Sequence, residues 1–457
     1  MDKKLSFFLL YSFFTITVYG QDFNIFKYHA IGDGKTLNTT AIQKAIDECA
    51  RHGGGNVIVP AGTFLTAGIF LKDNVNLHLE PGAVLLGDYQ NPEYRALVYL
   101  KNVKNAAVTG TGTIAGNGAH FKIGDEAPNR PYVLFVENSE GIQVKDIHFR
   151  DGASWTLRLF NSKHILIRGI SIYSHANFNN DGIDIDSKDV LISDCNINTG
   201  DDALCFKSDN PQRMCENISV INCQLASNCN FIKMGTSSYG GFRNITISNC
   251  HLQKTNIMPL KEQQWNLKSQ GTIQDSISGL AGIALEVVDG GSMDQITISN
   301  ISMTGVQTPI FIRLGNRRNA AGSLKNILIS QITAKAVSQI TSSITAVPGF
   351  YVENVTLRDL IFELPGGITT SMENYVVPEK EKAYPENRQF GWILPAYGMY
   401  IRHAKKIALD NIQFHLKEGD ERPAIILEDV SDCKINAPFL TPERIKQINT
   451  SNIQTRF

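Results

Sequence analysis

Two short acidic motifs contain the residues best suited to chemistry. Asn180-Asp181-Gly182 is followed, a short way along the chain, by Gly200-Asp201-Asp202. Carboxyl groups that lie close together raise one another's pKa values, so one can keep its proton while another stays ionised. An acid and a base of this kind are what the hydrolysis of a glycosidic bond requires. The motifs therefore predict a carboxylate-driven glycoside hydrolase whose catalytic residues are Asp181, Asp201 and Asp202.

A repeated strand pattern indicates how the two motifs could meet. Nine segments share a template with apolar residues at its second, fourth and seventh positions. β-Branched residues at period two are typical of a strand with one buried face. Most adjacent segments begin about 23 to 31 residues apart, which is typical of a solenoid whose turns stack on their neighbours. The segments are 141–149, 164–172, 189–197, 217–225, 244–252, 295–303, 326–334, 354–362 and 406–414.

The predicted fold class is all-β: a single-stranded right-handed parallel β-helix with a short N-terminal capping helix. The repeat is too short for strand–helix–strand units throughout, and a β-propeller, the main alternative, needs about 40 to 45 residues for each blade. Ile42, Ala45, Ile46 and Cys49 lie at helical spacing. Because an open solenoid end exposes core, residues 38–49 are predicted to form the capping helix.

Stacking of the turns gives the acidic residues their expected neighbours. Aligning Ser187 with Ser208 superposes Asp181 on Asp202, and strands of adjacent turns lie about 4.8 Å apart. Asp201 is then expected beside the pair. Acidic residues at solenoid corners also form hydrogen bonds within turns, and clustered carboxylates can hold calcium. A structural role and a calcium site therefore remain alternatives at this point.

Composition and the N-terminal segment favour an exported protein. The chain has 42% hydrophobic residues and a net charge of -1, which gives no general attraction to nucleic acid or anionic membranes. Residues 1–20 contain Lys3, Lys4 and an apolar run, a pattern typical of a secretory signal rather than a membrane span. Residues 21–457 are expected to form one catalytic β-helix domain in the periplasm or outside the cell. The sequence leaves the oligomeric state open.

Three cysteines replace isoleucine at the seventh template position. Cys195, Cys223 and Cys250 occupy this position in consecutive segments. Free cysteine packs as a small apolar residue, so we expect a buried thiol ladder. No cysteine spacing is typical of a zinc site, and no metal or other cofactor is expected.

Four motifs follow one another in a fixed order along the chain. They are Gly32-Asp33-Gly34 with 38–42, 110–114 with 116–118, Asn180-Asp181-Gly182-Ile183-Asp184, and Gly200-Asp201-Asp202. Together they resemble glycoside hydrolase family 28, the polygalacturonase-like pectinases, from about residue 28 to past residue 429. The resemblance implies a right-handed β-helix and hydrolysis with inversion, without a metal. It also implies that Asp201 protonates the leaving oxygen while Asp181 and Asp202 orient and deprotonate water.

Two segments differ from the pattern of that family. In place of Gly-His-Gly, one turn after the Asp pair, the chain has Asn228-Cys229-Asn230-Phe231, with Lys233 nearby and expected to stack over Lys207. In place of Arg-Ile-Lys, which binds the substrate carboxylate in the family, it has Ala284-Leu285-Glu286. Either a cation from another position binds the carboxylate, or the sugar is neutral and Glu286 binds its hydroxyl groups.

Candidate substrate-binding residues surround the predicted acids or belong to segments that interrupt the repeat. Charged and amide side chains would bind hydroxyl or carboxylate groups, and tryptophan rings would stack on sugars. Arg317 is a further possible cation. The candidates are Asn180, Lys207, Asn230, Lys233, Glu286, Arg313, Trp155 and Trp392.

The predicted function is hydrolysis of a pectic polysaccharide or oligosaccharide, either galacturonate-containing or a rhamnogalacturonan. The long segments 254–278 and 371–397 break the repeat and could wall one end of the cleft, which would favour removal of sugars from a chain end. Two alternatives remain. A β-helix polysaccharide lyase would need a strong base beside a uronate, and a non-catalytic glycan-binding module would not need the acidic cluster.

Overall fold

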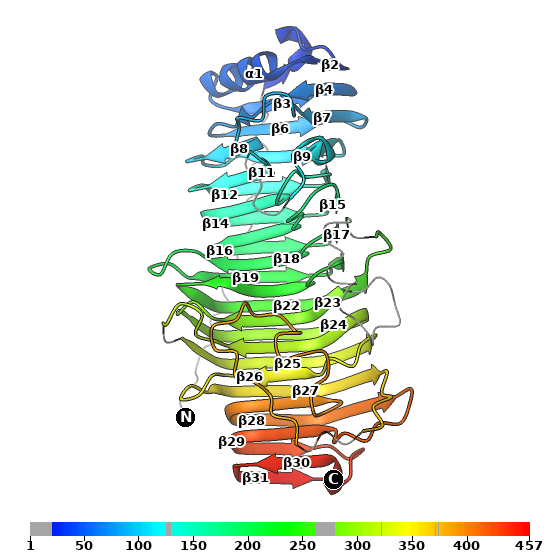
Figure 1. Ribbon diagram of the computed structural model, residues 1–457. Helices are drawn as coiled ribbons and strands as arrows, with labels where there is room; N and C mark the ends of the chain where they lie inside the picture. The colour runs from blue at the N-terminus through cyan, green and yellow to red at the C-terminus, as the bar shows by residue number, and fades with distance from the viewer. Residues whose placement is uncertain are drawn as a thin grey trace, which may run out of the picture.

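The chain winds into an elongated right-handed parallel β-helix, with the helix α1 (Thr39–Arg51) at its N-terminal end (Figure 1). The predicted fold class and its capping helix are therefore confirmed. Among the helices described, none is both long and apolar enough to cross a membrane. The expected signal segment 1–20 lies outside the described residues. The computed structural model describes residues 21–124, 129–258, 260, 279–320, 322–370, 372 and 374–457.

Successive turns contribute strands to three parallel ladders, and several long strands bend so that they join more than one ladder. The first ladder contains β1 (Gln21–Asn24), β3 (Gly55–Val59), β6 (Val75–Leu79), β9 (Ala107–Gly110), β12 (Glu140–Lys145), β14 (Leu157–Arg168), β16 (Ile183–Ser193), β19 (Cys215–Ile221), β22 (Gly241–Lys254), β24 (Ser292–Leu314), β25 (Ser323–Ala336), β27 (Val352–Leu364), β28 (Met399–Leu416), β29 (Ile425–Asn436) and β31 (Ser451–Arg456). The second contains β2 (Asp33–Leu37), β4 (Gly62–Thr66), β7 (Ala83–Gly87), β10 (Thr113–Ala115), β13 (His148–Arg150), β15 (Ser171–Ser174), β17 (Asn196–Thr199), β20 (Gln224–Ser227) and parts of β22, β24, β25, β27 and β28. The third contains β5 (Ile69–Phe70), β8 (Ala96–Lys101), β11 (Tyr132–Glu137), β18 (Leu204–Ser208), β21 (Ile232–Ser238), β23 (Gly279–Val287), β26 (Ser342–Thr345), β30 (Ile445–Ile448) and parts of β14, β16, β24, β28 and β29. Among the described residues, strands are also connected by three short 3-10 helices, η1 (Ile25–Tyr28), η2 (Gly118–His120) and η4 (Pro442–Arg444).

The core consists of like residues stacked on like, as the repeat template predicts. Ile245, Ile296 and Ile327 pair on consecutive turns, and each is 2% exposed or less. The seventh template position is also buried in every copy. Cys195, Cys223 and Cys250 are buried free thiols, which agrees with the predicted thiol ladder.

Asparagine and aspartate form the corners between the first two ladders. Asp194, Asn222, Asn249 and Asn300 all have positive φ angles between 54° and 59°, the left-handed conformation that these side chains tolerate best. Their side chains stack along the solenoid: Asn222 donates to Asp194 at 3.1 Å, and Asn300 donates to Asn249 at 2.8 Å. The corners therefore keep successive turns in the same register.

The capping helix α1 covers the open end of the core with one apolar face. Asn38 occupies the N-cap position but does not cap the helix with its side chain. Its amide instead donates to Ile31 O at 3.0 Å and accepts from Ile31 N at 2.7 Å, which fixes the preceding loop. The buried residues of the helix are Ile42, Ala45, Ile46 and Cys49, as the helical spacing predicts.

Candidate active site

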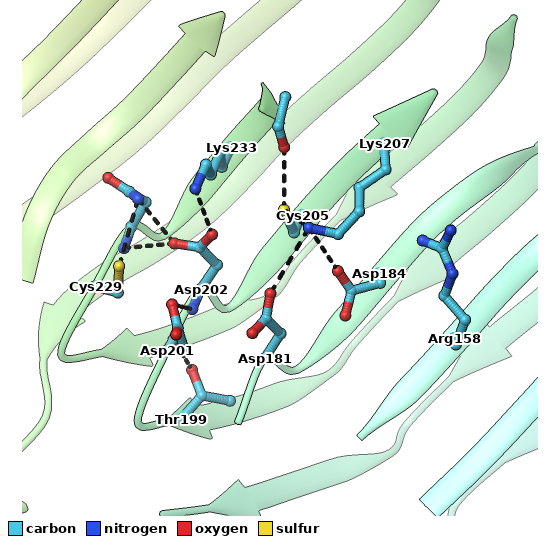
Figure 2. Close-up of polar contacts among 12 residues, drawn as sticks. Arg158, Asp181, Asp184, Thr199, Asp201, Asp202, Cys205, Lys207, Cys229 and Lys233 are labelled. Atoms are coloured by element: carbon cyan, nitrogen blue, oxygen red, sulfur yellow. Dashed lines mark hydrogen bonds and ion pairs between the residues drawn. The ribbon is translucent and has the colours of Figure 1, made fainter. Parts of the chain in front are cut away.

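The two acidic motifs meet on adjacent turns of the third ladder. Ile183 pairs with Leu204 at the start of β16 and β18, and Gly182 N donates to Asp202 O at 2.9 Å. This register places Asp181 over Asp202, as predicted. Figure 2 shows both carboxylates at the same end of the strands, with two lysines reaching toward them.

Asp202 is held as an ionised carboxylate by three neighbours. Its Oδ1 accepts hydrogen bonds from the backbone N–H of Asn230 at 3.1 Å and from the Asn230 amide at 2.8 Å. Its Oδ2 lies 2.9 Å from Lys233 Nζ. Burial alone would raise the pKa of Asp202, but Lys233 and Lys207 together lower it to about 2. Lys233 and Asn230, expected to bind substrate, therefore contact the Asp202 carboxylate.

Asp201 differs from its neighbour in both contacts and charge. It is half-buried, and its Oδ1 accepts the backbone N–H of Asp202 at 2.9 Å. Burial and the negative charge of Asp202 raise the pKa of Asp201 to about 6, although Lys233 acts in the opposite direction. Asp201 therefore keeps a proton over a pH range in which Asp202 is ionised.

Asp181 and Asp184 share the second lysine. Lys207 Nζ lies 3.1 Å from Asp184 Oδ1 and 4.0 Å from Asp181 Oδ2. Burial raises the pKa values of both carboxyl groups, and the charges of Asp184 and Asp201 raise that of Asp181 further. Burial disfavours the charged form of Lys207, but Cys205, Asp184 and Asp181 hold the pKa of the ammonium well above its usual range. Lys207 therefore stays positively charged.

The prediction that Lys233 stacks over Lys207 is wrong. In the observed register Lys233 pairs with Cys205, and the pairing of β18 with β21 shifts between Phe206 and Ser208. Lys233 is thus two residues nearer than Lys207 to the strand end at which Asp202 lies, and the shift comes only after this pair. The two lysines consequently approach different carboxylates instead of forming one cationic patch.

Among the described residues, two groups could supply metal ligands, each with two aspartates and one cysteine whose ligand atoms lie within 4.8 Å of one another. In each group a lysine ammonium already contacts a carboxylate, at 3.1 Å for Lys207 and 2.9 Å for Lys233. These ammonium groups provide the positive charge that a calcium ion would otherwise bring to the carboxylate oxygens. The groups are Asp181, Asp184 and Cys205, and Asp201, Asp202 and Cys229.

Glu286 lies one turn beyond Gly235 on the same ladder, and its side chain is 1% exposed. A Cβ atom at Gly235 would come within 2.9 Å of the Glu286 Cβ, so the glycine leaves space for this carboxyl group. The Oε2 atom of Glu286 has no hydrogen-bond partner. Burial raises the pKa of Glu286 to about 8, although Lys233 opposes the shift. Glu286 therefore carries a proton at neutral pH.

Two aromatic residues border the carboxylates. The Trp155 ring centroid lies 4.6 Å from Lys207 Nζ, so this predicted residue is at the site. Tyr384, which sequence reasoning missed, places its hydroxyl 3.2 Å from Lys233 Nζ and is 55% exposed. Its position in the long segment 371–397 was the only signal that could have found it. Trp392 packs against Arg388, and no described contact connects it with the aspartates.

The structure places two of the predicted substrate-binding residues, Asn180 and Arg313, inside the fold. Asn180 is fully buried, donates to Gly152 O at 2.8 Å and accepts from Asn177 N at 2.7 Å. Arg313 is 1% exposed and donates to Ala346 O at 3.0 Å. Buried polar groups need protein partners, and these two side chains stabilise loops of the fold.

Comparison with known proteins identifies the relatives of this architecture. The family model described as glycosyl hydrolases family 28 matches residues 49–378, which is more than half of the chain. A probable polygalacturonase from Vitis vinifera is 32% identical over 215 residues, covering 40% of this chain and 44% of the relative. An exo-poly-alpha-D-galacturonosidase from Dickeya chrysanthemi is 27% identical over 261 residues, covering 42% of this chain and 43% of the relative. The chain thus spans less than half the length of these two curated relatives.

A solved structure shares the fold at low sequence identity. The crystal structure of a hyperthermoactive exopolygalacturonase from Thermotoga maritima superposes with a TM-score of 0.63 at 20% identity. The match covers 86% of this chain and 92% of that protein. The shared architecture therefore extends over nearly the whole β-helix.

Proposed function

Because the chain belongs to glycosyl hydrolases family 28, we propose that it is an inverting glycoside hydrolase that cleaves pectic polysaccharides or oligosaccharides. The observation that best supports this activity is the difference between two adjacent carboxyl groups. Asp201 has a pKa of about 6, whereas the pKa of Asp202 is about 2. At mildly acidic pH the site therefore contains both a proton donor and a charged carboxylate, which is what glycoside hydrolysis requires.

In the proposed reaction Asp201 donates its proton to the glycosidic oxygen while the bond from that oxygen to the anomeric carbon breaks. A water molecule held by Asp181 and Asp202 attacks the anomeric carbon from the opposite face and gives one proton to this pair. The pair needs one negative charge to accept that proton, and Asp202 supplies it. Inverting enzymes usually hold the acid and the base about 6.5 to 9.5 Å apart, whereas an oxygen of Asp201 lies within 4.8 Å of an oxygen of Asp202, so the anomeric configuration of the product is a direct test of this mechanism. Exchange with solvent then returns the proton to Asp201.

The charged state of the two lysines favours hydrolysis over a lyase reaction. A lyase needs an uncharged base beside a uronate, and Lys207 and Lys233 are the amines nearest the aspartates among the described residues. Burial alone would lower the pKa values of both, but their acidic neighbours hold them well above the usual range. Neither amine can therefore abstract a proton at neutral pH. Formation of unsaturated products would contradict this assignment.

We also propose that sugars are removed from a chain end. The segment 371–397 lies against the β-helix, where the Asn387 amide donates to Thr308 of β24 at 3.0 Å, and it brings Tyr384 to Lys233. A wall beside the carboxylates shortens a cleft and disfavours binding in the middle of a polymer. The names of the relatives from Dickeya chrysanthemi and Thermotoga maritima, both exo-acting enzymes, support this proposal. Most of the segment 254–278 lies outside the described residues.

Export from the cytoplasm belongs to the same proposal, because the substrate is a polymer found outside the cell. It is supported by the signal-like pattern of residues 1–20. Mass spectrometry of the protein recovered from periplasm and medium would test it. An N-terminus beginning near Gln21 is expected, whereas an intact Met1 in a cytoplasmic fraction would contradict export.

The decisive experiment is product analysis with the wild-type enzyme and Asp201→Asn. Polygalacturonate, rhamnogalacturonan and their oligosaccharides are incubated with each protein, and reducing ends, unsaturated products and anomeric configuration are followed. We expect saturated products of inverted configuration from the wild type and almost none from the variant. Products that accumulate one sugar or short unit at a time indicate chain-end action, and a ladder of intermediate sizes would contradict it. Absence of hydrolysis with every substrate would overturn the proposed function.

A further inference from the structure

The cations nearest the catalytic carboxyl groups are already bound to protein carboxylates. Only 12% of the Lys207 side chain and 6% of the Lys233 side chain is exposed. Lys207 contacts Asp184 at 3.1 Å, and Lys233 contacts Asp202 at 2.9 Å. An incoming sugar carboxylate would have to compete with these buried ion pairs. Breaking a buried pair leaves an uncompensated charge, which is strongly unfavourable.

Two arginines near the site also form ion pairs with carboxylates of the protein. Arg158 follows along the ladder and forms an ion pair with Asp209. Arg317 donates from two nitrogens to Asp289, at 2.8 and 2.6 Å. Of the cations described around the three aspartates, each one therefore has a carboxylate partner from the chain itself. None of these four side chains is left to bind a uronate as its only counter-ion.

Acidic groups outnumber ammonium groups at the centre of the site. Five carboxyl groups, including Glu286, accompany two ammonium groups. The pKa of Asp181 is raised well above its usual range, so with Asp181, Asp201 and Glu286 protonated the carboxylates of Asp184 and Asp202 already balance the two ammonium charges. A uronate would add another negative charge in a partly desolvated space, where like charges repel strongly. A neutral sugar meets no such penalty.

Glu286 also offers a specific partner to a neutral sugar. One of its oxygens is buried without a hydrogen-bond partner, and the carboxyl group is directed to the side of the ladder where Lys233 and Tyr384 lie. Unpaired buried oxygens are unfavourable, and a sugar hydroxyl supplies the missing hydrogen bond. The half-buried Trp155 ring and the exposed Tyr384 ring add faces on which a sugar ring can stack.

We propose that the glycosyl residue bound against the three catalytic aspartates is a neutral sugar, and that Glu286 is the residue that determines this preference over a uronic acid. This inference rests on the proposed glycosidase function, and it names the substrate class of the same site. Uronic acids can still occupy neighbouring positions of the glycan. The cleaved bond is the one that joins the neutral residue to its neighbour.

The test uses pairs of oligosaccharides that differ only in charge. Oligogalacturonates, in which a uronate must occupy the position against the three aspartates, are compared with their carboxyl-reduced counterparts, in which each uronate has become a neutral hexose. For each pair kcat/KM is measured with the wild type, Glu286→Arg and Glu353→Arg. Glu353 is exposed, so its variant makes the same change in net charge away from the site. Calorimetric binding to Asp201→Asn provides a second readout that does not depend on turnover.

The expected result is a higher kcat/KM and tighter binding for the neutral member of each pair with the wild type. The ratio of kcat/KM for the neutral member to kcat/KM for the uronate should fall at least about tenfold in Glu286→Arg. In Glu353→Arg the same ratio should remain unchanged. A wild-type preference for the uronate, or an unchanged ratio in Glu286→Arg, would overturn the inference while hydrolysis stands. If no substrate is cleaved, the proposed hydrolase function fails, and the binding preference still decides the inference. The reducing-end sugar released from rhamnogalacturonan gives the same answer independently: a neutral sugar supports the inference, and galacturonate contradicts it.

Discussion

Lys233 Nζ lies 2.9 Å from Asp202 Oδ2, and only 6% and 3% of the two side chains is exposed. A buried ion pair is tolerated when further hydrogen bonds satisfy its remaining atoms, and Asn230 donates two to the other carboxylate oxygen. No salt bridge to Asp201 occurs among the described residues. The pair therefore decides which of two adjacent aspartates is charged and which can act as the acid.

Replacement of the proposed acid should abolish turnover without unfolding the protein. Asp201→Asn removes the proton donor, so we expect kcat to fall by about 10² to 10⁴-fold. Asp201 is half-buried and makes few side-chain contacts, so the thermal midpoint should change little. Asp47→Asn, at a 50% exposed side chain, is the matched control and should keep wild-type activity. An active Asp201→Asn enzyme would remove Asp201 from the mechanism.

The dependence of kcat/KM on pH should report both aspartates. Asp201 must be protonated, so activity should decrease as pH rises through about 6. Asp202 must be ionised, so the acidic limb should lie far lower, toward its pKa of about 2. Lys233→Met removes the charge that lowers the Asp202 pKa and should move the acidic limb to higher pH. Lys335→Met, at a 62% exposed side chain, serves as control. An acidic limb that does not move in Lys233→Met would contradict the assignment.

The buried carboxyl group of Glu286 should make stability depend on pH. Its pKa is 4.5 in the unfolded reference and about 8 in the folded protein. Between these values the unfolded state binds fewer protons, so stability should fall as pH rises through this window. The side chain in Glu286→Gln cannot ionise, so this variant should not lose stability in the same way. The free energy of unfolding of Glu286→Gln minus that of the wild type should increase between pH 5 and pH 8, on the order of a few kcal/mol. Urea unfolding at both pH values, with Glu353→Gln as control, measures this difference. Parallel behaviour of wild type and Glu286→Gln would show that Glu286 is not buried in the folded protein.

Tyr384 should contribute to substrate binding through its ring. The hydroxyl lies 3.2 Å from Lys233 Nζ, and the ring centroid lies 5.8 Å from the Arg317 Cζ. Tyr384→Phe keeps the face on which a sugar can stack and should retain most of the affinity. Tyr384→Ala should raise KM by about tenfold with a smaller change in kcat. Steady-state kinetics separate the two effects, and equal KM values for the alanine variant and wild type would place Tyr384 outside the binding site.

The sequence alone determined the β-helix and the meeting of the two acidic motifs. Each turn buries the same apolar positions, so the period of the repeat is visible without coordinates. Asp181 could be placed over Asp202 because β16 and β18 pair without an irregularity between the aligned residues. The capping helix was predictable for the same kind of local reason, since its buried residues recur at helical spacing.

Only the tertiary structure decided the partners of the charged residues. The pairing of β18 with β21 sets Lys233 beside Cys205, two residues before Lys207, and its ammonium lies 2.9 Å from Asp202. Tyr384 reaches Lys233 across 151 residues of sequence, from a segment that has no repeat. Side-chain charges pair according to distance and burial in space, and these are set by strand register and by long connections. The periodic residues that form the core carry no information about them.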